Sequence, residues 1–509
     1  MLFYHSQSFM NLNRNNRQHH VKLKTVFFTA ALLSVVTLAW VFLIFDRNLY
    51  CLNHHQSSHS VSSIFPWEPT DSENLVNRTS LPASWKSNGS YTRRDLKMRH
   101  ILFGIAGSAQ LWPFRKEYVK LWWRPAEMRG FVWLEELARD QENELLPPIK
   151  VSEDVGNFSY TNPAGHPSGI RIARIVQEAF RLNLPDIRWF VMGDDDTFFA
   201  PDNLLEVLRK YDHNDMFYIG NPSESHSSNT YFSHGMAFGG GGIAISYPLA
   251  KALSNVLDEC LERYPFLFGS DDRLHACISE LGVPLTKEAG FHQFDIHGDA
   301  FGLMAAHPIA PFVSMHHLDE VGRFFPGYSA LDGLHRLANA LRTEPGSFLQ
   351  QCICYDRRNK VTFSISIGYV VQVYLYVLLP KDLGRPEITF KAWNKKDGRG
   401  EFDLDTRSAI KSRCNKPLLF YLDTINHQGS DVVSTYKLDP STVRRRWRLL
   451  CSSIPPYLNP VQQIHISSKP MTEHWYKVPR RQCCKITYVK GYELGITVQH
   501  CQRGNGRVT

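Results

Sequence analysis

Short apolar runs alternate with amphipathic segments in the first half of the ordered sequence. Residues 101–106 and 131–133 form apolar runs typical of buried strands, and the segment between them has helical spacing. Residues 170–182 predict an amphipathic helix that leads directly into a further apolar run at residues 189–192. This order of strand, helix and strand predicts an α/β domain in which residues 189–192 form a buried parallel strand.

Residues 361–375 follow a different pattern, with apolar and polar residues in alternation. A period of two is typical of a β-strand, and the Ser, Thr and Gln positions fall on one side of it. We therefore expect one long strand with one face in solvent. Shorter alternating runs at residues 388–390, 486–488 and 494–498 extend the prediction to an all-β C-terminal domain without a recognisable catalytic group.

The N-terminal part contains a run of twenty residues without a charge, residues 26–45, which is long enough to cross a bilayer as a helix. Basic residues precede the run, so the N-terminus is expected in the cytosol and the rest in the lumen. At 509 residues and 43% hydrophobic content, the chain can form two or more folded domains. The expected organisation is a cytosolic tail (1–25), a transmembrane signal anchor (26–45), a lumenal stem (46–95), an α/β domain (96–345) and a β-rich domain (346–509).

Glycosylation and cysteine patterns agree with a lumenal location. Triplets for N-glycosylation begin at Asn77, Asn88 and Asn157. The ten cysteines would face an oxidising solvent, and they lack the paired C-x-x-C spacing of a zinc site, so disulfides are the better interpretation. The cysteines concerned include Cys352, Cys354, Cys483 and Cys484, as well as Cys260 and Cys277, which could be bridged to each other. Cys51 either is free or joins two chains, which leaves a homodimer open.

The charge balance is mildly basic, with a formal net charge of +8 and a pI near 8.9. One dense cluster of arginines occurs, at residues 444–448, and the exposed face of a helix explains it most simply. No nucleic-acid-binding motif accompanies it, so nucleic acid is not an expected partner.

Three consecutive carboxylates follow the apolar run at residues 189–192. At about 4 Å, each like-charged pair among Asp194, Asp195 and Asp196 costs roughly 1 to 4 kcal/mol. A divalent cation with a preference for oxygen ligands, Mg²⁺ or Mn²⁺, would relieve this repulsion, and phosphates commonly complete such sites. The simpler alternative is that one aspartate caps the next helix, which leaves the triplet unexplained.

Two further motifs follow the triplet along the chain. The run Gly239, Gly240, Gly241 and Gly242 lets the backbone approach a ligand closely, although a mobile turn explains it equally well. A second acidic pair, Asp271 and Asp272, begins a predicted helix at residues 274–281. One aspartate there is accounted for by the helix N-terminus, whereas two side by side are harder to explain in that way.

Candidate residues for binding a metal or substrate also lie outside these motifs. His316 and His317 follow an apolar strand, where histidines are more often structural than ligating. In the company of two carboxylate clusters, an imidazole ligand would favour Mn²⁺ over Mg²⁺. Arg115 is a further candidate for binding the substrate.

These motifs, taken in order, resemble the Fringe-like β1,3-glycosyltransferase family, and within it the plant Fringe-related branch with an additional C-terminal β-rich domain. The similarity covers roughly residues 98–325. It implies a GT-A-like fold, in which a nucleotide sugar lies over a mostly parallel sheet, and residence in the Golgi membrane as a single-pass type II protein.

The resemblance also implies roles for individual residues. Asp196 matches the direct metal ligand of the acidic triplet, and Asp194 lies nearer the ribose and is a second candidate ligand. Asp272 matches the catalytic base, with Asp271 beside it. The C-terminal histidine that completes the metal site is His316 or His317, and residues 239–242 match a Gly-rich loop on the acceptor side. Gly107 and Ser108 stand where the family has threonines, which leaves the donor sugar open, and Ala276 stands where the family usually has Gly.

The implied activity is an inverting, Mn²⁺-dependent transfer of a hexose or N-acetylhexosamine from a UDP-sugar to a glycan or glycoprotein hydroxyl, with a β1,3 linkage. A carboxylate would take the proton from the acceptor hydroxyl, and Mn²⁺ would offset the charge on the leaving UDP. The alternative is a glycan-binding or scaffold protein that keeps the fold and has lost the chemistry. The intact acidic clusters argue against that alternative.

Overall fold

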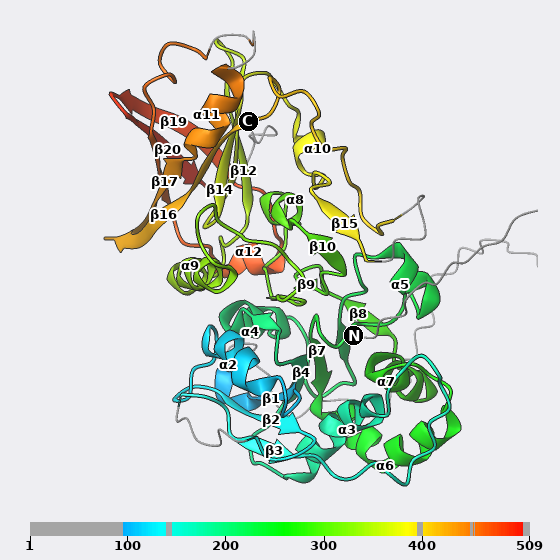
Figure 1. The fold of residues 1–509 in the computed structure, drawn as a ribbon. Helices are drawn as coiled ribbons and strands as arrows, with labels where there is room; N and C mark the ends of the chain where they lie inside the picture. Colours follow the sequence, from blue (N-terminus) through cyan, green and yellow to red (C-terminus); the bar gives the residue numbers. More distant parts are fainter. Residues whose placement is uncertain (1–94, 139–144, 394–400, 448–450, 452–453, 502–509) are drawn as a thin grey trace, which may run out of the picture. The chain divides into compact units, whose positions relative to one another are not determined.

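Two buried parallel strands form the centre of a seven-stranded sheet (Figure 1). β1 (Ile101–Ala106) pairs with β4 (Trp189–Asp194), and every residue of the two strands is buried except Asp194, which is half-buried. They correspond to two of the apolar runs in the sequence. The strand order is β3-β2-β1-β4-β7-β6-β8, with β2 (Arg129–Leu134), β3 (Ile149–Val151), β6 (Tyr218–Gly220), β7 (Ile243–Ser246) and β8 (Leu285–Lys287).

The computed structural model describes residues 95–138, 145–393, 401–447, 451 and 454–501. The chain divides into two units, Met1–Asn88 and Gly89–Thr509, and the first lies wholly outside the described residues. The predicted tail, anchor and stem therefore lie outside the described residues, except for Asp95. Asn77, Asn88 and Cys51 lie outside them as well. Of the helices in the described part, none is long and apolar enough to span a membrane. Asn157 is described and is exposed between β3 and the next helix.

The seven-stranded sheet is mixed. The pairs β1–β2, β2–β3, β1–β4 and β6–β8 are parallel. β7 is antiparallel to both of its neighbours, β4 and β6. The predicted α/β architecture is confirmed, and its parallel character is interrupted at β7.

Helices cover both faces of this sheet, which explains why its central strands are apolar throughout. Leu102 and Ala106 of β1 pack in one apolar cluster with α3 (Ser168–Arg181) and α6 (Tyr247–Arg263). The alternate β1 residues Ile101, Phe103 and Ile105 pack in a second cluster on the other face. The remaining helices around the sheet are α2 (Trp112–Lys120) and α4 (Pro201–Leu208) in the second cluster, and α7 (Ser270–Glu280) in the first.

A second large sheet of eight strands occupies most of the C-terminal part of the described chain. Its pairs are antiparallel apart from β18–β20. In spatial order the strands are β12 (Gln351–Asp356), β13 (Val361–Ser366), β14 (Val370–Tyr374), β16 (Leu418–Gln428), β17 (Asp431–Leu438), β18 (Gln463–Ser468), β20 (Glu493–Gln499) and β19 (Cys483–Lys490).

Smaller elements connect or flank the two sheets. A three-stranded sheet has the order β5 (Phe198–Phe199), β11 (Ser314–Met315), β9 (Phe291–His292), and β10 (Ile296–Gly298) pairs with β15 (Phe390–Ala392). The other helices are η4 (Met98–His100), α5 (His226–Tyr231), α8 (Phe301–Ala305), α9 (Ala330–Thr343), α10 (Pro380–Leu383), α11 (Pro440–Trp447) and α12 (Glu473–Lys477).

The alternating segment at residues 361–375 differs from the prediction in two ways. It forms two strands, β13 and β14, with Gly368 between them at a φ of +80°. Its polar side is also buried. The hydroxyl of Thr362 donates to the carbonyl of Tyr376 at 2.9 Å, and that of Ser366 donates to the carbonyl of Met304 at 2.8 Å. The prediction of one half-solvated strand was wrong because buried hydrogen-bond acceptors, rather than water, satisfy these side chains.

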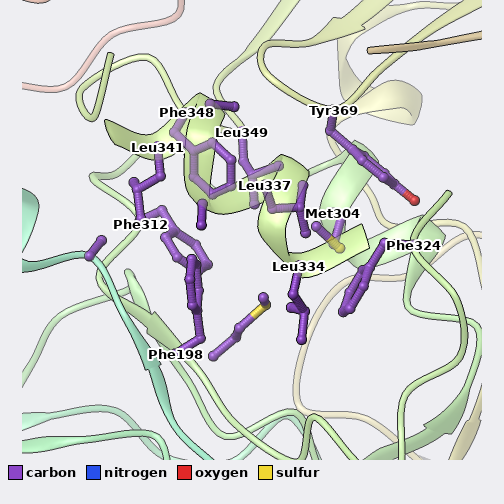
Figure 2. Packing of buried hydrophobic residues seen from close by; sticks show 14 of the residues in the cluster. Phe198, Met304, Phe312, Phe324, Leu334, Leu337, Leu341, Phe348, Leu349 and Tyr369 are labelled. Atoms are coloured by element: carbon purple, nitrogen blue, oxygen red, sulfur yellow. The ribbon is translucent and has the colours of Figure 1, made fainter. Parts of the chain in front are cut away.

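One apolar cluster extends from the first sheet into the second (Figure 2). Phe198 of β5 and Phe312 have ring centroids 6.4 Å apart, and Phe312 lies 5.2 Å from Phe348 in an edge-to-face arrangement. Leu334 and Leu337 of α9 belong to the same cluster. Residues on both sides of the boundary expected near residue 345 therefore share a core.

Four disulfides are present among the described cysteines. Cys260 of α6 is bonded to Cys277 of α7 with their Cα atoms 5.8 Å apart, so this predicted bridge is confirmed. The other pairs are Cys354–Cys484, Cys414–Cys451 and Cys483–Cys501. The prediction fails for Cys352, which is free and buried. Cys352 and Cys354 are two residues apart on β12 and lie on the same face of the strand, but Cys354 is the one that meets a cysteine of β19.

We expect Gly368→Ala to destabilise the protein more than Gly429→Ala does. Both glycines have a positive φ, +80° and +63°, so each alanine carries a backbone cost of about 1–2 kcal/mol. A Cβ at residue 368 would also approach Ala340 and Phe348 to 3.1 Å, whereas a Cβ at residue 429 would meet nothing within 4 Å. Crowding of this kind typically adds about 1–3 kcal/mol. Urea unfolding of the two variants measures the difference, and equal midpoints would contradict the packing of the β13–β14 turn.

Candidate active site

The acidic triplet lies at the carboxyl ends of the two central strands. Asp194 is the last residue of β4, and the backbone amide of Asp195 donates to the carbonyl of Ala106, the last residue of β1, at 2.8 Å. In open α/β sheets, ligands bind outside the carboxyl ends of the strands. The buried strands therefore present three carboxylates at the edge where a ligand is expected.

Thr197 fixes the loop that carries the triplet. Its hydroxyl accepts a hydrogen bond from the amide of Asp194 at 2.8 Å and donates to the carbonyl of Gly240 at 2.7 Å. Thr197 is fully buried. Thr197 was not predicted from the sequence, although its place directly after the triplet was a signal for it.

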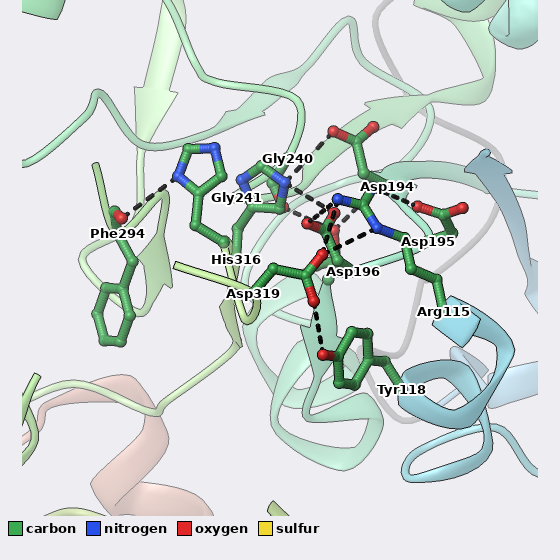
Figure 3. A network of polar contacts seen from close by, with 12 residues as sticks. Arg115, Tyr118, Asp194, Asp195, Asp196, Gly240, Gly241, Phe294, His316 and Asp319 are labelled. Atoms are coloured by element: carbon green, nitrogen blue, oxygen red, sulfur yellow. Dashed lines mark hydrogen bonds and ion pairs between the residues drawn. The ribbon is translucent and has the colours of Figure 1, made fainter. Parts of the chain in front are cut away.

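Arg115 of α2 extends into the triplet (Figure 3). Its Nη1 is 2.9 Å from Oδ1 of Asp195, and its Nη2 is 3.1 Å from Oδ2 of Asp196. The positive charge that the triplet requires is thus supplied in part by this guanidinium. Arg115 was a candidate for binding substrate, and the structure places it directly against the acidic residues.

Asp319 adds a fourth carboxylate to the network. It lies 2.9 Å from Nη2 of Arg115 and accepts a hydrogen bond from the Tyr118 hydroxyl at 2.6 Å. Neither Asp319 nor Tyr118 was identified from the sequence. Asp319 is close in sequence to His316 and His317 but lies more than a hundred residues from the triplet. Its position along the chain was therefore only a weak indication that it joins the site.

His316 reaches the triplet from the side opposite Arg115 (Figure 3). It follows β11, which pairs with β5 directly after the triplet. The His316 Nε2 is 3.0 Å from Oδ1 of Asp196 and 3.4 Å from Oδ2 of Asp194. Burial lowers the pKa of His316, but the adjacent Asp196 and Asp194 outweigh burial and raise that pKa to about 9.

His317 is directed elsewhere. Its Nδ1 lies 3.3 Å from Oδ1 of Asp295, and its ring stacks on Trp393 with centroids 4.3 Å apart. Burial and the neighbouring His316 lower the pKa of His317 to about 3. The sequence left the choice between the two histidines open, and the structure brings the side chain of His316 to the triplet.

The glycine run is packed against the charged residues. A Cβ on Gly239 would lie 2.5 Å from Oδ1 of Asp271, and a Cβ on Gly240 would lie 2.1 Å from the His316 ring. The amide of Gly241 donates to Gln293 at 2.7 Å, and Gly242 has a φ of +99°. These contacts argue against a mobile turn, because the missing Cβ atoms make room for the Asp271 and His316 side chains. The approach of this backbone to a ligand stays a prediction.

The second acidic pair occupies the N-terminus of α7, and its two members have different contacts. Asp272 accepts three backbone hydrogen bonds, from the amides of Phe268, Gly269 and Arg273, at 2.8–2.9 Å. Asp271 accepts hydrogen bonds from the Gly239 backbone and, at 3.0 Å, from the Ser270 hydroxyl. Burial raises the pKa of both carboxyls, that of Asp271 to about 6. Asp271 also lines a small pocket that Asp194 shares.

The pKa values of the triplet carboxyls diverge. Burial, together with neighbouring carboxylates, raises the pKa of Asp194 to about 7. Burial raises that of Asp195 to about 6 although Arg115 opposes it. At Asp196, burial also acts to raise the pKa, but His316 and Arg115 dominate and lower it to about 2. Asp196 is therefore the member of the triplet held most firmly as a carboxylate.

The arrangement fits a divalent cation. One ligand atom from each of Asp194, Asp196 and His316 can be chosen so that all lie within 4.8 Å of one another. Two carboxylates and one imidazole suit Mn²⁺. Four carboxylates in the network, counting Asp195 and Asp319, face one guanidinium and one imidazole, so the negative charge is only partly compensated.

Comparison with known proteins identifies two family models along this chain. Residues 140–299 match the model described as Fringe-like, which confirms the resemblance inferred from the motifs. This segment contains the acidic triplet, the glycine run and the acidic pair. A second model, described as "Protein of unknown function, DUF604", matches residues 228–484, which is half of the chain.

Curated relatives match a shorter segment. The chain is 31% identical over 129 residues to the rat (Rattus norvegicus) protein named UDP-GlcNAc:betaGal beta-1,3-N-acetylglucosaminyltransferase 7, and 30% identical over 126 residues to the mouse (Mus musculus) protein of the same name. Each match spans 22% of this chain and 31% of the relative.

Solved structures show weaker likenesses. Mouse xyloside xylosyltransferase 1 in its apo form is 13% identical, with 36% of this chain and 81% of that chain covered. A glycosyltransferase involved in glycosylation of the PBCV-1 major capsid is 12% identical, with 46% and 97% covered. Both have a TM-score of 0.25, which is too low to bear on the fold. From the family models, the chain belongs to the family described as "Protein of unknown function, DUF604" and contains a Fringe-like segment that holds most of the candidate active site.

Proposed function

We propose that the protein is an inverting glycosyltransferase of GT-A-like fold that transfers a hexose or N-acetylhexosamine from a UDP-sugar to an acceptor hydroxyl. The observation that carries the proposal is the meeting of the acidic triplet, His316 and Arg115 at the carboxyl ends of β1 and β4. The Fringe-like match over residues 140–299 supports it. The names of the curated relatives make UDP-GlcNAc the first donor to test and a β1,3 linkage the first product to expect.

The donor diphosphate would bind at the triplet. Asp196, Asp194 and His316 would hold Mn²⁺, which when bound offsets negative charge on the diphosphate. Arg115 already lies within ion-pair distance of Asp195 and Asp196, so its guanidinium can turn to a phosphate oxygen while Asp195 retains it in the site. The glycine run lets the Asp271 carboxyl and the His316 ring lie directly against its backbone, which keeps both groups at the donor site.

The acceptor proton would be taken at the α7 N-terminus. Asp272 is the base implied by the family resemblance, and burial raises its pKa, which improves it as a base near neutral pH. Its Oδ2 accepts a single hydrogen bond, from the Phe268 amide, so a lone pair remains for a hydroxyl. Asp271, which contacts Gly239 and lines the pocket shared with Asp194, would position the pair.

We further propose that the protein is a single-pass type II Golgi membrane protein, anchored by residues 26–45, with the described part in the lumen. Four disulfides among the described residues are typical of an oxidising compartment. The exposed position of Asn157 leaves that residue accessible for glycosylation.

A second candidate function is a glycan-binding or scaffold protein without catalytic activity. The contacts of Arg115 favour it, because this residue relieves part of the repulsion within the triplet and thereby lets an inactive site keep its aspartates. The two candidates differ in one observable, the release of UDP from a sugar donor.

We expect the full-length protein, purified in detergent, to release UDP from UDP-GlcNAc or a related UDP-sugar only when Mn²⁺ and an acceptor glycan are present. Asp196→Asn removes the most firmly ionised ligand of the triplet, so UDP release should fall by about 100-fold or more. Glu493→Gln, at an exposed position on β20, is the control and should retain activity. A wild-type protein no more active than Asp196→Asn with any donor and acceptor would favour the scaffold function.

We expect Asp272→Asn to lower turnover by about 10²- to 10⁴-fold, as loss of a general base does. UDP-sugar binding, measured by calorimetry with Mn²⁺, should be unchanged because the triplet is intact. Asp271→Asn should have a smaller effect on turnover. If Asp271→Asn lost as much turnover as Asp272→Asn, or more, the assignment of the base would have to be exchanged between the two residues.

A further inference from the structure

A second group of metal-ligating side chains lies outside the candidate active site. It consists of His226, the first residue of α5, His234 in the following turn, and Asp403, which is 177 residues from His226 along the chain (α5 is labelled in Figure 1). The His226 Nδ1 lies 2.5 Å from Oδ1 of Asp403, and the His234 Nε2 lies 3.1 Å from Oδ2 of Asp403. One ligand atom from each residue falls within 4.8 Å of the other two.

Backbone hydrogen bonds hold the two segments together independently of these side chains. Ser225 and Phe402 form an isolated antiparallel bridge. The amide of His226 donates to the carbonyl of Glu401 at 3.2 Å, and the amide of Asp403 donates to the carbonyl of Glu224 at 3.0 Å. The positions of the first and third ligands are therefore set by the main chain before any ion binds.

Outer contacts also orient the ligands. The side-chain amide of Asn229 donates to Oδ2 of Asp403 at 2.7 Å. The Thr230 hydroxyl lies 3.4 Å from Nε2 of His226, on the far side of the ring from Asp403. Hydrogen bonding to the second ring nitrogen orients a ligating histidine, and the Thr230 hydroxyl is placed to accept from Nε2–H when Nδ1 binds the ion.

We propose that His226, His234 and Asp403 form a Zn²⁺ site, with water at the fourth position. Two imidazoles and one carboxylate are typical zinc ligands, whereas the two carboxylates and one imidazole of the triplet suit Mn²⁺. At Zn²⁺ distances of about 2.0–2.1 Å, tetrahedral ligand atoms lie about 3.3 Å apart. The ligand atoms of His226 and Asp403 need to separate by less than about 1 Å from their observed distance, and the side chains, 46%, 56% and 24% exposed, have room to do so.

The bound ion would add a cross-link between two parts of the chain that backbone hydrogen bonds and side-chain contacts already connect. His226 and His234 lie on either side of the rest of α5, a few residues before the glycine run, and Asp403 belongs to the segment that follows β15. A cross-link at this point would stabilise the segment that leads into the glycine run, residues 239–242, from outside the candidate active site. The proposal does not depend on glycosyl transfer, because it concerns ion binding and local stability alone.

The test is Zn²⁺ binding by the metal-free, purified full-length protein, measured by competition with a chromophoric chelator. The experiment uses the Asp196→Asn background so that the triplet does not contribute. We expect one ion per chain in this background and at least about tenfold weaker binding after His234→Ala or Asp403→Asn, since each removes one of three protein ligands. His335→Ala, at an exposed position on α9, is the matched control and should bind Zn²⁺ as its parent does.

Hydrogen exchange supplies a second readout on the same proteins. Zn²⁺ should slow exchange of the His226 and Asp403 amides in the parent and in His335→Ala, and should leave it unchanged in His234→Gln, which retains a polar side chain of similar length. If the parent binds no Zn²⁺, or if the double variant His226→Ala/His234→Ala binds it as tightly as the parent, the three side chains form ordinary surface ion pairs and the proposal is overturned.

Discussion

Negative charge crowded at the end of β4 is the constraint on which the candidate site depends. The buried strand ends at Asp194, and the next two residues are also aspartates, so the fold must bring positive groups to them or leave them protonated. Arg115 arrives from α2 and His316 from β11. Their effect is greatest at Asp196, whose pKa falls to about 2, while burial holds the pKa of Asp194 near 7. Carboxyls whose pKa values are shifted by burial and by specific charged neighbours cluster at functional sites.

The second sheet has a direct part in this arrangement. Phe312 precedes the strand that delivers His316, and its ring packs against Phe348 in the apolar cluster that also contains β13 and β14. The position of His316 therefore depends on packing that involves both large sheets. The family model over residues 228–484 likewise extends from α5 into β19, across both parts. The two parts share one apolar cluster, and in a close-packed core neither side can repack without disturbing the other.

Close backbone approach is the other requirement of the site. Gly239 and Gly240 lie where a Cβ would strike Asp271 and His316, so the glycine run brings the α7 carboxylates and the triplet histidine to one segment of main chain. Thr197 connects the same segment to the triplet through the carbonyl of Gly240. The disulfide between Cys260 and Cys277 ties α6 to α7, whose first turn carries Asp271 and Asp272. The charged groups are thus held by covalent and backbone contacts as well as by their mutual attraction.

The sequence alone determined the central strands, the helices that cover them and the types of residue at the site, because hydrophobic periodicity and charge clusters are local properties of the chain. Only the tertiary structure showed that His316 rather than His317 reaches the triplet, since the two adjacent side chains point to different neighbours. It also showed that the polar side of residues 361–375 is buried, that Cys352 has no disulfide partner among the described cysteines, and that Asp319, His226, His234 and Asp403 join charged clusters. These outcomes depend on which distant segments meet, and the spacing of residues along the chain does not contain that information.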